Sequence, residues 1–313
     1  MVEVKLFSGT KSKYLAEKIA YFYGEELAAC EVKTFSDGEM RIVIDESVRG
    51  AHIFFITSTF APSDNLLELL LMIDSAKRAS AGYITAVIPY YGYARQDRKD
   101  KPRVPISAKL IANLLQAAGA NRIMTMDLHA DQIQGFFDIP VDHLKGEAIF
   151  MPYLEKQDLT NTIFASPDVG GVKRARSFAK YFKRDLVICD KERIKANEVK
   201  SITVIGDVTG ADVILVDDLI DTAGTLCKAA DALIEKGARS VKAMCTHPVL
   251  SGKAYENIEN SQISKIITTD TIPLKRQSDK IEVLSCAQLF SKAIRNTHEY
   301  KSIAALFVDK SLD

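Results

Sequence analysis

Short β-branched apolar runs alternate with longer stretches of helical periodicity along almost the whole chain. The apolar runs predict strands, and the stretches with apolar residues every three or four positions predict amphipathic helices. Alternation of this kind is typical of an α/β fold in which mainly parallel sheets carry helices on both faces. Runs such as Val213–Val216 are continuously apolar, as buried parallel strands are. The predicted strands are Val2–Phe7, Glu31–Phe35, Arg41–Ile44, His52–Ser58, Tyr83–Pro89, Arg122–Asp127, Thr162–Ala165, Asp185–Cys189, Ser201–Ile205, Asp212–Val216, Ser240–Cys245 and Lys265–Thr269, and the predicted helices include Asp64–Ser80, Ser107–Ala118, Ala223–Lys236 and Gly252–Glu259.

The chain has 313 residues, which is long enough for two domains of ordinary size. The segment Phe150–Thr162 contains Pro152, a charged cluster and turn-forming residues, so we place the domain boundary there. This predicts two α/β domains, residues 1–150 and residues 151–313. Each half has an apolar strand that leads directly into polar sequence, at Met124–His129 and at Leu215–Asp218. A duplication is therefore an open alternative, but the similarity of the halves is too weak to establish it.

The overall composition changes this picture little. Hydrophobic residues make up 47% and charged residues 26%, which is typical of a globular protein. The 41 basic and 41 acidic residues balance, so bulk charge gives no reason to expect a nucleic acid or an anionic membrane as partner. Five cysteines without a CxxC pair argue against a disulfide framework or a structural zinc site. Because the start lacks a signal-peptide pattern and no apolar run has membrane length, we expect a cytoplasmic protein.

The segment with the clearest chemistry is Val213–Thr225, where a buried strand is followed by carboxylates and by a loop of small and hydroxyl residues that opens a helix. Ligands of open α/β sheets bind beyond the carboxyl ends of the strands, and a helix N-terminus offers its N–H groups to a phosphate. Ala223 and Gly224 allow the backbone to approach an anion closely, while the neighbouring threonines add hydroxyl donors. The pattern therefore favours a phosphate site at this strand end.

The carboxylates of this segment need a different role. Adjacent carboxylates at Asp217 and Asp218 would repel a phosphate, so they fit better as acceptors for sugar hydroxyls or as outer ligands of Mg²⁺. The alternative is an Asp-rich turn that only caps a helix, since Asp and Thr are ordinary capping residues. No GxxxxGK[ST] loop occurs, and no GxGxxG follows a strand, so ATP would be held in another way. The candidate phosphosugar residues are Asp217, Asp218, Asp221, Thr222, Ala223, Gly224 and Thr225.

Segment Val213–Thr225 resembles the phosphoribosyl-pyrophosphate loop of the type I phosphoribosyltransferase fold. A second segment, Asp127–Asp142, is similar throughout to the signature of the ribose-phosphate pyrophosphokinases, or phosphoribosyl pyrophosphate synthetases. This family resemblance implies two tandem phosphoribosyltransferase-like domains, each a mainly parallel sheet with helices on both faces. It runs nearly from end to end of the chain and also includes Phe35–Glu39, Tyr93–Asp97, Ser166–Arg176 and Lys191–Arg193.

The resemblance implies a Mg²⁺-dependent enzyme that moves the β,γ-pyrophosphoryl group of ATP onto the 1-hydroxyl of ribose 5-phosphate, with AMP leaving. It also implies a homohexamer whose ATP site lies at a subunit interface. Two alternatives remain. A catalytically silent regulatory paralogue would keep the fold and lose the reactive residues. A phosphoribosyltransferase would share the sugar-phosphate loop, but would have no reason to carry Phe35–Glu39 or Asp127–Asp142.

Carried over residue by residue, the resemblance assigns most of the candidate site. We interpret the charged segment Lys191–Lys200 as a mobile loop, and its Lys191 and Arg193 as the catalytic cations. His129 and Asp168 are assigned to Mg²⁺ together with the triphosphate, although a histidine is a less usual ligand for this ion. The residues assigned to ATP binding are Phe35, Asp37, Glu39, Arg95, Gln96 and Asp97, and those of the pyrophosphate loop are Asp168, Gly170 and Gly171.

The pyrophosphate loop has a physical interpretation of its own. Ser166–Arg176 consists of a strand end, a Gly-Gly loop and a basic helix start. We expect Gly170 and Gly171 to adopt positive φ, so that consecutive N–H groups form an anion-binding nest. For the basic residues that follow, Lys173, Arg174 and Arg176, a solvated helix face is an equally good interpretation.

The other histidines and the C-terminal segment carry weaker signals. His52, His143, His247 and His298 have no motif around them, and we interpret them as structural. Members of this family controlled by ADP and phosphate usually carry a Ser-x-Ser pair near the C-terminus, where this chain has Ser302 followed by Ile303 and Ala304. Arg49 and Arg103, the other contacts expected for a regulatory phosphate, are present. We therefore expect activation by phosphate to be weaker than is usual for the family.

Overall fold

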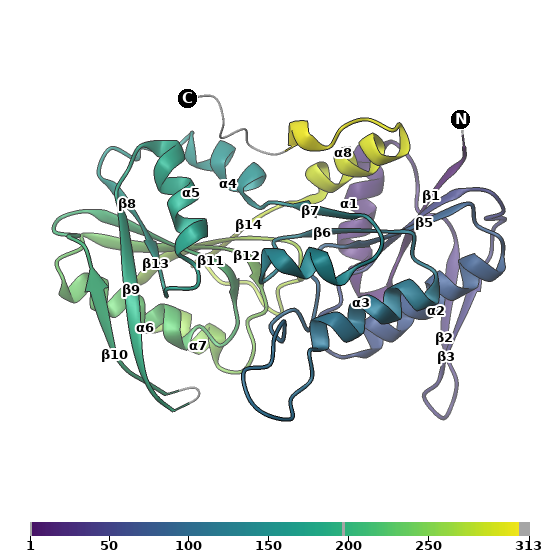
Figure 1. The fold of residues 1–313 in the computed structure, drawn as a ribbon. Coiled ribbons are helices and arrows are strands. Elements are labelled where there is room, and N and C mark those ends of the chain that lie inside the picture. The colour runs from purple at the N-terminus through teal and green to yellow at the C-terminus, as the bar shows by residue number, and fades with distance from the viewer. Residues whose placement is uncertain (1, 196–197, 307–313) are drawn as a thin grey trace. The chain divides into compact units, whose positions relative to one another are not determined.

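The computed structural model describes residues 2–195 and 198–306 and divides the chain into two compact units (Figure 1). Unit 1 contains the chain up to Gly146 and returns for the described residues from Cys286 onward, and unit 2 is Glu147–Ser285. In the part of the chain that the structure describes, no helix is both long and apolar enough to cross a membrane.

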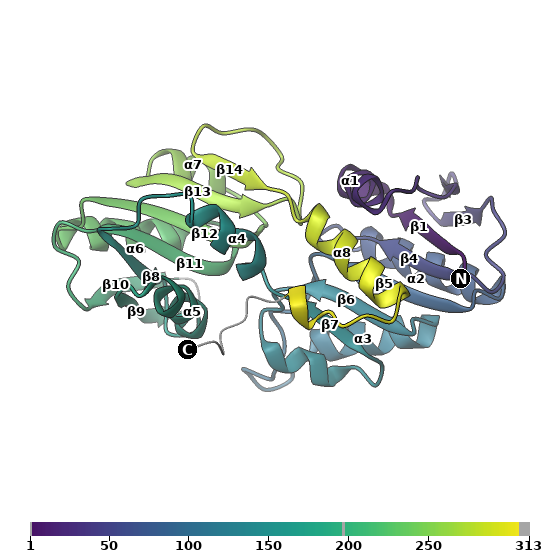
Figure 2. The ribbon, with the colours of Figure 1, turned by 90° about the horizontal axis from the view of Figure 1, so that it is seen from above.

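Unit 1 is built on a five-stranded sheet with the order β1-β4-β5-β6-β7, and all four neighbouring pairs are parallel. Helices α2 and α3 pack together on one face, and α1 packs with α8 on the other (Figures 1 and 2). A separate antiparallel hairpin, β2–β3, follows α1. The strands are β1 (Val4–Ser8), β2 (Cys30–Thr34), β3 (Met40–Ile44), β4 (His52–Ile56), β5 (Tyr83–Ile88), β6 (Arg122–Met126) and β7 (Val141–Leu144), and the helices are α1 (Lys13–Tyr23), α2 (Asp64–Arg78), α3 (Ser107–Ala118) and α8 (Ala287–His298).

Unit 2 is built on a seven-stranded sheet with the order β10-β9-β8-β11-β12-β13-β14. Its strands are parallel except for β10, which pairs antiparallel with β9. The strands are β8 (Thr162–Ser166), β9 (Leu186–Lys195), β10 (Glu198–Ile205), β11 (Asp212–Ile220), β12 (Ser240–Pro248), β13 (Ile263–Thr269) and β14 (Ile281–Leu284), and the helices are α4 (Glu147–Leu154), α5 (Val172–Phe182), α6 (Gly224–Glu235) and α7 (Ala254–Glu259).

The continuously apolar runs form the centre of each sheet. Every residue of β4 is buried, and so are Val213–Val216 of β11, because helices cover both faces of these strands. The predicted α/β class with parallel sheets and flanking helices is therefore confirmed. Each unit has its own apolar core, in which sheet residues pack against helix residues such as Leu69 of α2 and Leu233 of α6.

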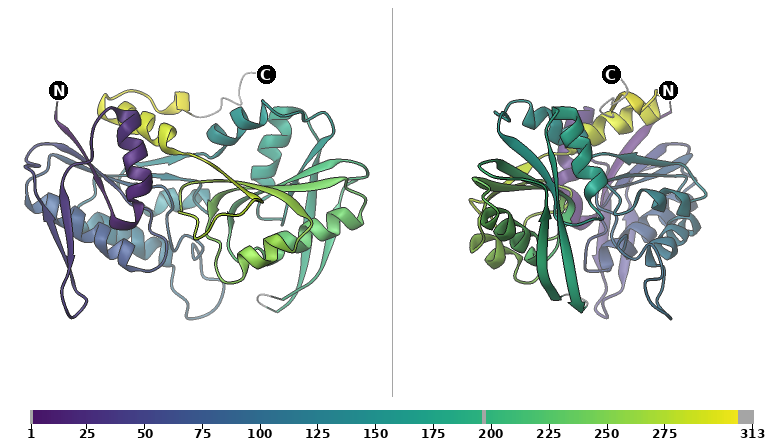
Figure 3. Two further views of the ribbon diagram at one scale, coloured as in Figure 1. Left: turned by 180° about the vertical axis from the view of Figure 1, so that it is seen from behind. Right: turned by 60° about the vertical axis from the view of Figure 1, so that its left-hand side comes forward.

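The two units repeat one order of elements: strand, helix, hairpin, strand, helix, strand, helix and two further strands. Strands β1-β4-β5-β6-β7 and β8-β11-β12-β13-β14 occupy the same sequence of places in their sheets. The hairpins β2–β3 and β9–β10 follow the first helix of each repeat, and Figure 3 shows that both extend beyond the ends of the parallel strands. The structure thus shows the internal repeat that the sequence left open.

Segment Lys191–Lys200 differs from its prediction. Where the sequence predicted a mobile loop, the described backbone continues β9 to Lys195 and pairs it with β10. The apolar parts of both strands are anchored in the core, where Val187, Cys189 and Val204 are buried. Beyond them, backbone hydrogen bonds between the two strands continue the pairing whatever the polarity of the side chains. Residues 196 and 197 of the predicted loop lie outside the described residues.

The C-terminal helix also differs from the simple division of the sequence. The sequence predicted that residues 151–313 form one domain, but the structure groups α8 with unit 1. Helix α8 packs on α1, and the guanidinium carbon of Arg295 in α8 lies 4.5 Å from the ring centroid of Tyr23. Thr297 of α8 also donates to Asp142 of β7 at 3.5 Å. The chain therefore leaves unit 1 once and returns to complete it.

We expect His52, the first residue of β4, to make the fold sensitive to acid. Burial, followed by the charges of His298 and Arg122, lowers the pKa of His52 from 6.5 to about 4. A lowered histidine pKa contributes stability that is fully present above 6.5 and is lost as the pH falls toward 4. Allowing for partial hydration of the ring, the loss is about 1–2 kcal/mol. Thermal unfolding measured from pH 7 to pH 4 should show a shallower decline for His52→Phe than for the wild type; equal slopes would contradict this origin.

Candidate functional site

The predicted pyrophosphate and phosphosugar segments meet at the carboxyl edge of the unit 2 sheet. Strands β8 and β11 are parallel neighbours, with Asp212 opposite Thr162 and Leu215 opposite Ala165. Their carboxyl ends therefore open at the same edge, where ligands of α/β sheets bind. Strand β11 continues to Ile220, so that Asp217 and Asp218 belong to the strand and not to the loop.

The loop from Asp221 to Ala223 is held by hydrogen bonds from other segments. The hydroxyl of Ser251 donates to a carboxylate oxygen of Asp221, and the Ser251 N–H donates to the Asp221 carbonyl at 3.1 Å. The amide of Asn257 donates to the Thr222 carbonyl at 2.9 Å. Ser251 and Asn257 lie outside every sequence motif, and no local signal could have found them. These bonds hold the Asp221 carboxylate and the Asp221 and Thr222 carbonyls in place, so the peptide N–H groups of the loop keep their orientation.

Helix α6 begins directly after this loop. Ala223 precedes it in the left-handed region, with φ of +61°, and no side chain of the described residues caps the helix there. The N–H groups of a first helical turn have no partner within the helix, and the helix dipole places partial positive charge beside them. This end of α6 is therefore suited to receive an anion.

The pyrophosphate loop has a different construction from the predicted nest. Gly171 has φ of −82°, and neither it nor Gly170 is among the glycines with positive φ. The expectation of positive φ at these glycines is therefore wrong. The requirement at Gly171 is steric, since a Cβ there would lie 2.7 Å from Oγ of Ser166. Asp168 closes the loop by accepting the Gly171 N–H at 3.0 Å through one carboxylate oxygen.

A cluster of three carboxylates and one guanidinium lies where the two loops meet. Arg174 of α5 contacts Asp218 at 3.3 Å and Asp217 at 3.8 Å, and the Asp218 N–H donates to Asp217 at 2.9 Å. Burial and the adjacent charge of Asp218 raise the pKa of Asp217 well above 3.8, and Asp168 adds to the same effect. Arg174 is thus part of the site, whereas Lys173 and Arg176 are exposed on the helix face.

In unit 1, the candidate ATP segments lie on loops at the carboxyl ends of β5 and β6. The hydroxyl of Thr59 accepts the Gly92 N–H at 2.8 Å, and a Cβ on Gly92 would lie 2.0 Å from the Thr59 carbonyl oxygen. This close approach directs the chain into Arg95, Gln96 and Asp97. Gln132 donates to Asp97 at 3.2 Å and so joins this segment to the one that carries His129.

The other predicted residues of unit 1 are exposed. Segment Phe35–Glu39 forms the tip of the β2–β3 hairpin, where Asp37 accepts the Glu39 N–H at 3.0 Å and Phe35 is 51% exposed. His129 is exposed just after the end of β6. The structure does not bring the hairpin tip together with the other ATP segments of its unit by any hydrogen bond or ion pair recorded among the described residues. An exposed aromatic side chain is suited to stack on a base.

Comparison with known proteins agrees with this arrangement. Residues 4–119 match the model of the N-terminal domain of ribose phosphate pyrophosphokinase, and residues 191–308 match the phosphoribosyl synthetase-associated domain. The ribose-phosphate pyrophosphokinase of Porphyromonas gingivalis is 55% identical over 303 residues, covering 96% of this chain and 97% of the relative. The chain belongs to the ribose-phosphate pyrophosphokinase family. The Campylobacter jejuni enzyme of the same name is also 55% identical, over 97% of this chain and 99% of its own length.

A solved structure extends the match to the fold. The crystal structure of phosphoribosylpyrophosphate synthetase from Mycobacterium smegmatis has a TM-score of 0.91 and 40% sequence identity, covering 95% of this chain and 99% of that one. The family resemblance and the predicted pair of phosphoribosyltransferase-like domains are thereby confirmed. As a member of the ribose-phosphate pyrophosphokinase family, the chain is an enzyme.

The catalytic cations expected for the ribose-phosphate pyrophosphokinase family lie on the β9–β10 ribbon. The backbone pairs Lys191 with Ile202 and Arg193 with Val199. The register shifts between Glu198 and Val199 and again between Val199 and Ser201. The side chains of Lys191 and Arg193 lie outside what the structure describes, so their roles remain predictions.

The carboxylates of the candidate site are donor groups of the kind that suit a magnesium ion. Within the described residues, no three His, Cys, Asp or Glu side chains converge as a protein-only metal cluster. Mg²⁺ commonly binds through one or two carboxylates together with water and substrate phosphates, which needs no such cluster. Burial, Asp218 and Asp168 raise the pKa of Asp217, and a nearby cation would relieve this effect.

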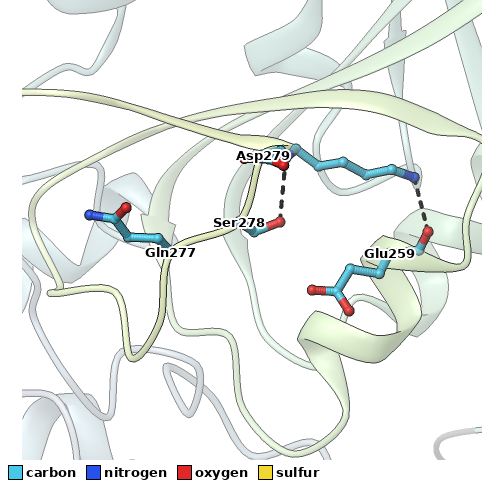
Figure 4. Close-up of a pocket in the computed structure, with 5 residues that line it drawn as sticks. Glu259, Gln277, Ser278 and Asp279 are labelled. Carbon is cyan, nitrogen blue, oxygen red and sulfur yellow. Dashed lines mark hydrogen bonds between the residues drawn. The ribbon is translucent and has the colours of Figure 1, made fainter.

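A separate pocket of about 380 Å³ lies at the opposite edge of the unit 2 sheet (Figure 4). It is lined by Glu259, at the end of α7, and by Gln277–Lys280, just before β14. The ammonium of Lys280 donates to the carbonyls of Ile258, Glu259 and Ser261 at 2.9–3.2 Å. These bonds cap the C-terminus of α7, so the pocket has a structural explanation and lies away from the candidate site.

Proposed function

We propose that this chain transfers the β,γ-pyrophosphoryl group of ATP to the 1-hydroxyl of ribose 5-phosphate, producing phosphoribosyl pyrophosphate and AMP. The observation that carries the proposal is the carboxyl edge of the unit 2 sheet, where crowded carboxylates stand beside the uncapped start of α6. The names of the relatives support the same reaction. The residues proposed for ribose 5-phosphate are Asp217, Asp218, Asp221, Thr222, Ala223, Gly224 and Thr225.

In this proposal, the 5-phosphate binds at the N-terminus of α6. The N–H groups after Ala223 and the hydroxyls of Thr222 and Thr225 donate to its oxygens. The carboxylates of Asp217 and Asp218 accept from the ribose hydroxyls, which directs the 1-hydroxyl toward the pyrophosphate loop. Asp168, Gly170 and Gly171 form that loop.

ATP is proposed to bind through unit 1. Phe35 stacks on the base, Asp37 and Glu39 accept from its amine or from the ribose, and Arg95 contacts phosphate together with Gln96 and Asp97. His129 and Asp168 would hold Mg²⁺ with the triphosphate, and the ion would supply charge neutralisation there. Lys191 and Arg193 stabilise the negative charge that builds up on the transferring oxygens.

The assembly and setting also follow the family. We propose a cytoplasmic homohexamer whose ATP site is shared between subunits, without nucleic acid or membrane as partner. The five cysteines support a reducing compartment, because all five are free. The uncovered Phe35–Glu39 tip supports a shared site, because exposed aromatic residues are common at contact surfaces.

Activation by phosphate is proposed to be weak. The hydroxyl of Ser302 accepts the Ala304 N–H at 3.1 Å, and Ala304 has no hydroxyl to offer a regulatory anion. Arg49 donates to Ser80 at 3.2 Å in the same unit. A regulatory phosphate would therefore meet fewer donors than the family pattern provides.

Product analysis tests the proposed reaction. The pure protein is incubated with ATP, ribose 5-phosphate, Mg²⁺ and phosphate, and the products are followed by ³¹P NMR. AMP and phosphoribosyl pyrophosphate in equal amounts support the proposal. ADP and free phosphate as the only products would show that the attack at the β-phosphorus is wrong. ATP binding without turnover would favour the silent regulatory paralogue, and consumption of phosphoribosyl pyrophosphate by an added base would favour a phosphoribosyltransferase.

A further inference from the structure

We propose that His143 is a positioning residue that holds the backbone next to His129, and thereby sets the affinity for Mg²⁺·ATP. No motif in the sequence separates His143 from the histidines that we interpret as structural. The inference rests on the proposed function, in which His129 contacts the Mg²⁺–triphosphate end of ATP.

The imidazole ring of His143 lies beside the segment that carries His129. His143 is on β7, and its side chain is 3% exposed. Its Nε2 accepts the Leu128 N–H at 2.8 Å, and its Nδ1 lies 3.7 Å from a carboxylate oxygen of Asp131. One buried ring thus faces the residue before His129 and a residue two positions after it.

The turn at Asp127 leaves the Leu128 N–H in need of an acceptor from outside the segment. Strand β6 ends at Met126, and Asp127 then adopts φ of +36°, which is uncommon for a residue other than glycine. Asp127 is fixed through its N–H to the Leu144 carbonyl at 3.0 Å and through its carboxylate to the Gly146 N–H at 3.1 Å. The Leu128 N–H then needs an acceptor, because leaving a buried donor unsatisfied costs about 1–3 kcal/mol. The His143 ring supplies that acceptor.

The surroundings of His143 select the tautomer that this role requires. Because Nε2 accepts a hydrogen bond, it carries no proton, and the proton of the neutral ring is on Nδ1. Nδ1 lies 3.7 Å from a carboxylate oxygen of Asp131 and 3.4 Å from the ammonium of Lys145, which itself donates to that carboxylate at 2.5 Å. The hydrogen bond from Leu128 therefore defines the tautomer of the neutral ring.

The segment held in this way reaches the rest of the proposed ATP site. Gln132, next to Asp131, donates to Asp97 at 3.2 Å. Loss of the His143 contacts should therefore disturb His129 and the Arg95–Asp97 segment together. The ribose 5-phosphate residues are on other loops, in unit 2, so their substrate affinity should not change.

The test compares His143→Phe, which keeps a ring without an acceptor, with His143→Gln, whose amide oxygen can accept the Leu128 N–H. Mg²⁺·ATP binding is measured by calorimetry without ribose 5-phosphate, and both KM values are measured in turnover. His143→Phe should raise the Kd and KM for Mg²⁺·ATP by about 10–100-fold and leave the KM for ribose 5-phosphate unchanged. His143→Gln should recover most of the loss.

His52→Phe is the matched control. His52 is also a buried histidine of unit 1 whose Nε2 lies 3.0 Å from a hydroxyl, that of Thr85, but it stands at the start of β4. Its replacement should lower Tm without changing the Kd for Mg²⁺·ATP. The proposal is overturned if His143→Phe binds Mg²⁺·ATP as the wild type does, or if His143→Gln binds it as weakly as His143→Phe.

A double-mutant cycle with His129→Ala tests the route of the effect. If His143 acts through His129, His143→Phe should weaken Mg²⁺·ATP binding much less in the His129→Ala background than in the wild type. Full additivity would overturn the proposal, as would an unchanged affinity in His129→Ala alone. A wild type that binds Mg²⁺·ATP but forms no phosphoribosyl pyrophosphate would overturn the proposed reaction only, because the binding comparison still decides the role of His143.

Discussion

Replacing Lys191 with alanine is expected to lower kcat by about 10²–10³-fold, while the KM values for ATP and ribose 5-phosphate change by no more than about threefold. The reason is that negative charge builds up on the transferring oxygens only as the β-phosphorus is attacked. A cation that meets this charge stabilises the transition state more than the bound substrates. We expect a smaller effect than removal of a sole catalytic arginine, because Arg193 shares the role.

Stopped-assay measurement of AMP formation at varied concentrations of both substrates separates kcat from KM. Lys180→Ala is the matched control, since it removes an exposed lysine from the last turn of α5 in the same unit. A change in the KM for ATP with an unchanged kcat would assign Lys191 to substrate binding instead. Wild-type kinetics in Lys191→Ala would remove it from the catalytic residues.

The arrangement of the sheets was predictable because the central strands are continuously apolar. Val213–Val216 and His52–Ile56 have no polar face that could meet water, so only a layer covered on both sides accommodates them. Short strands at the sheet margin were not predicted. β7 contains Asp142 and His143, and β14 is four residues long, so neither has the apolar run that indicates a strand.

The unpredicted strand β7 explains why His143 escaped notice. Its importance comes from lying beside β6 in the sheet, with His143 opposite Thr125. That neighbour is 18 positions away in sequence, and no local pattern links the two. Strands were predicted at Asp185–Cys189 and Ser201–Ile205, but their extension into Lys191–Lys200 was not, because backbone pairing stabilises it more than side-chain periodicity does.

The chemistry at the strand ends was easier to predict than its support. Parallel neighbours bring their carboxyl ends together, so Asp168 and Asp217 could be placed at one edge from the strand order alone. The hydrogen bonds that hold the loops come from elsewhere. Ser251 and Asn257 lie in the segment that follows β12, and nothing in their own sequence indicates that they fix the loop after β11.

The repeat of the fold helps to explain why the proposed pyrophosphate loop is in unit 2. The β1–α1 loop of unit 1 is the counterpart of the β8–α5 loop that carries Asp168. In unit 1 this position already has an anion, because buried Glu68 accepts the N–H of Thr10 at 2.6 Å and its hydroxyl at 3.0 Å. An internal carboxylate thus occupies the donors that a substrate phosphate would use. The β1–α1 loop of unit 1 is thus filled from inside, at the position where unit 2 has its proposed pyrophosphate loop.

Replacing Asp217 with asparagine is expected to stabilise the protein and impair it as an enzyme. The free energy of unfolding should rise by on the order of 1 kcal/mol at pH 8, which corresponds to a gain in Tm of about 2–4 °C. The gain arises because burial and the neighbouring Asp218, with Asp168, disfavour the charged form of Asp217 and raise its pKa. The loss in kcat/KM for ribose 5-phosphate should be about 10²-fold, because a carboxylate hydrogen bond to a sugar hydroxyl is lost.

The dependence of this gain on pH identifies its cause. The folded protein holds the Asp217 proton more tightly than the unfolded chain does, because burial and Asp218 raise the pKa above 3.8. The contribution of Asp217 to stability is therefore fully present below 3.8 and is lost as the pH rises through the raised value. The gain in Tm for Asp217→Asn should accordingly be larger at pH 8 than at pH 4.

Asp207→Asn is the control of opposite sign. The hydroxyl and N–H of Thr209 lower the pKa of Asp207, so its ionised form contributes stability above 3.8. Its replacement should lower Tm at pH 8 and leave turnover unchanged, because the Asp207 turn precedes β11 at the edge away from the site.

A Tm for Asp217→Asn at or below that of the wild type at pH 8 would mean that the crowded carboxylates are not strained. A gain in stability accompanied by the loss of activity would show that this edge of the sheet is kept electrostatically unfavourable because its substrate needs both carboxylates.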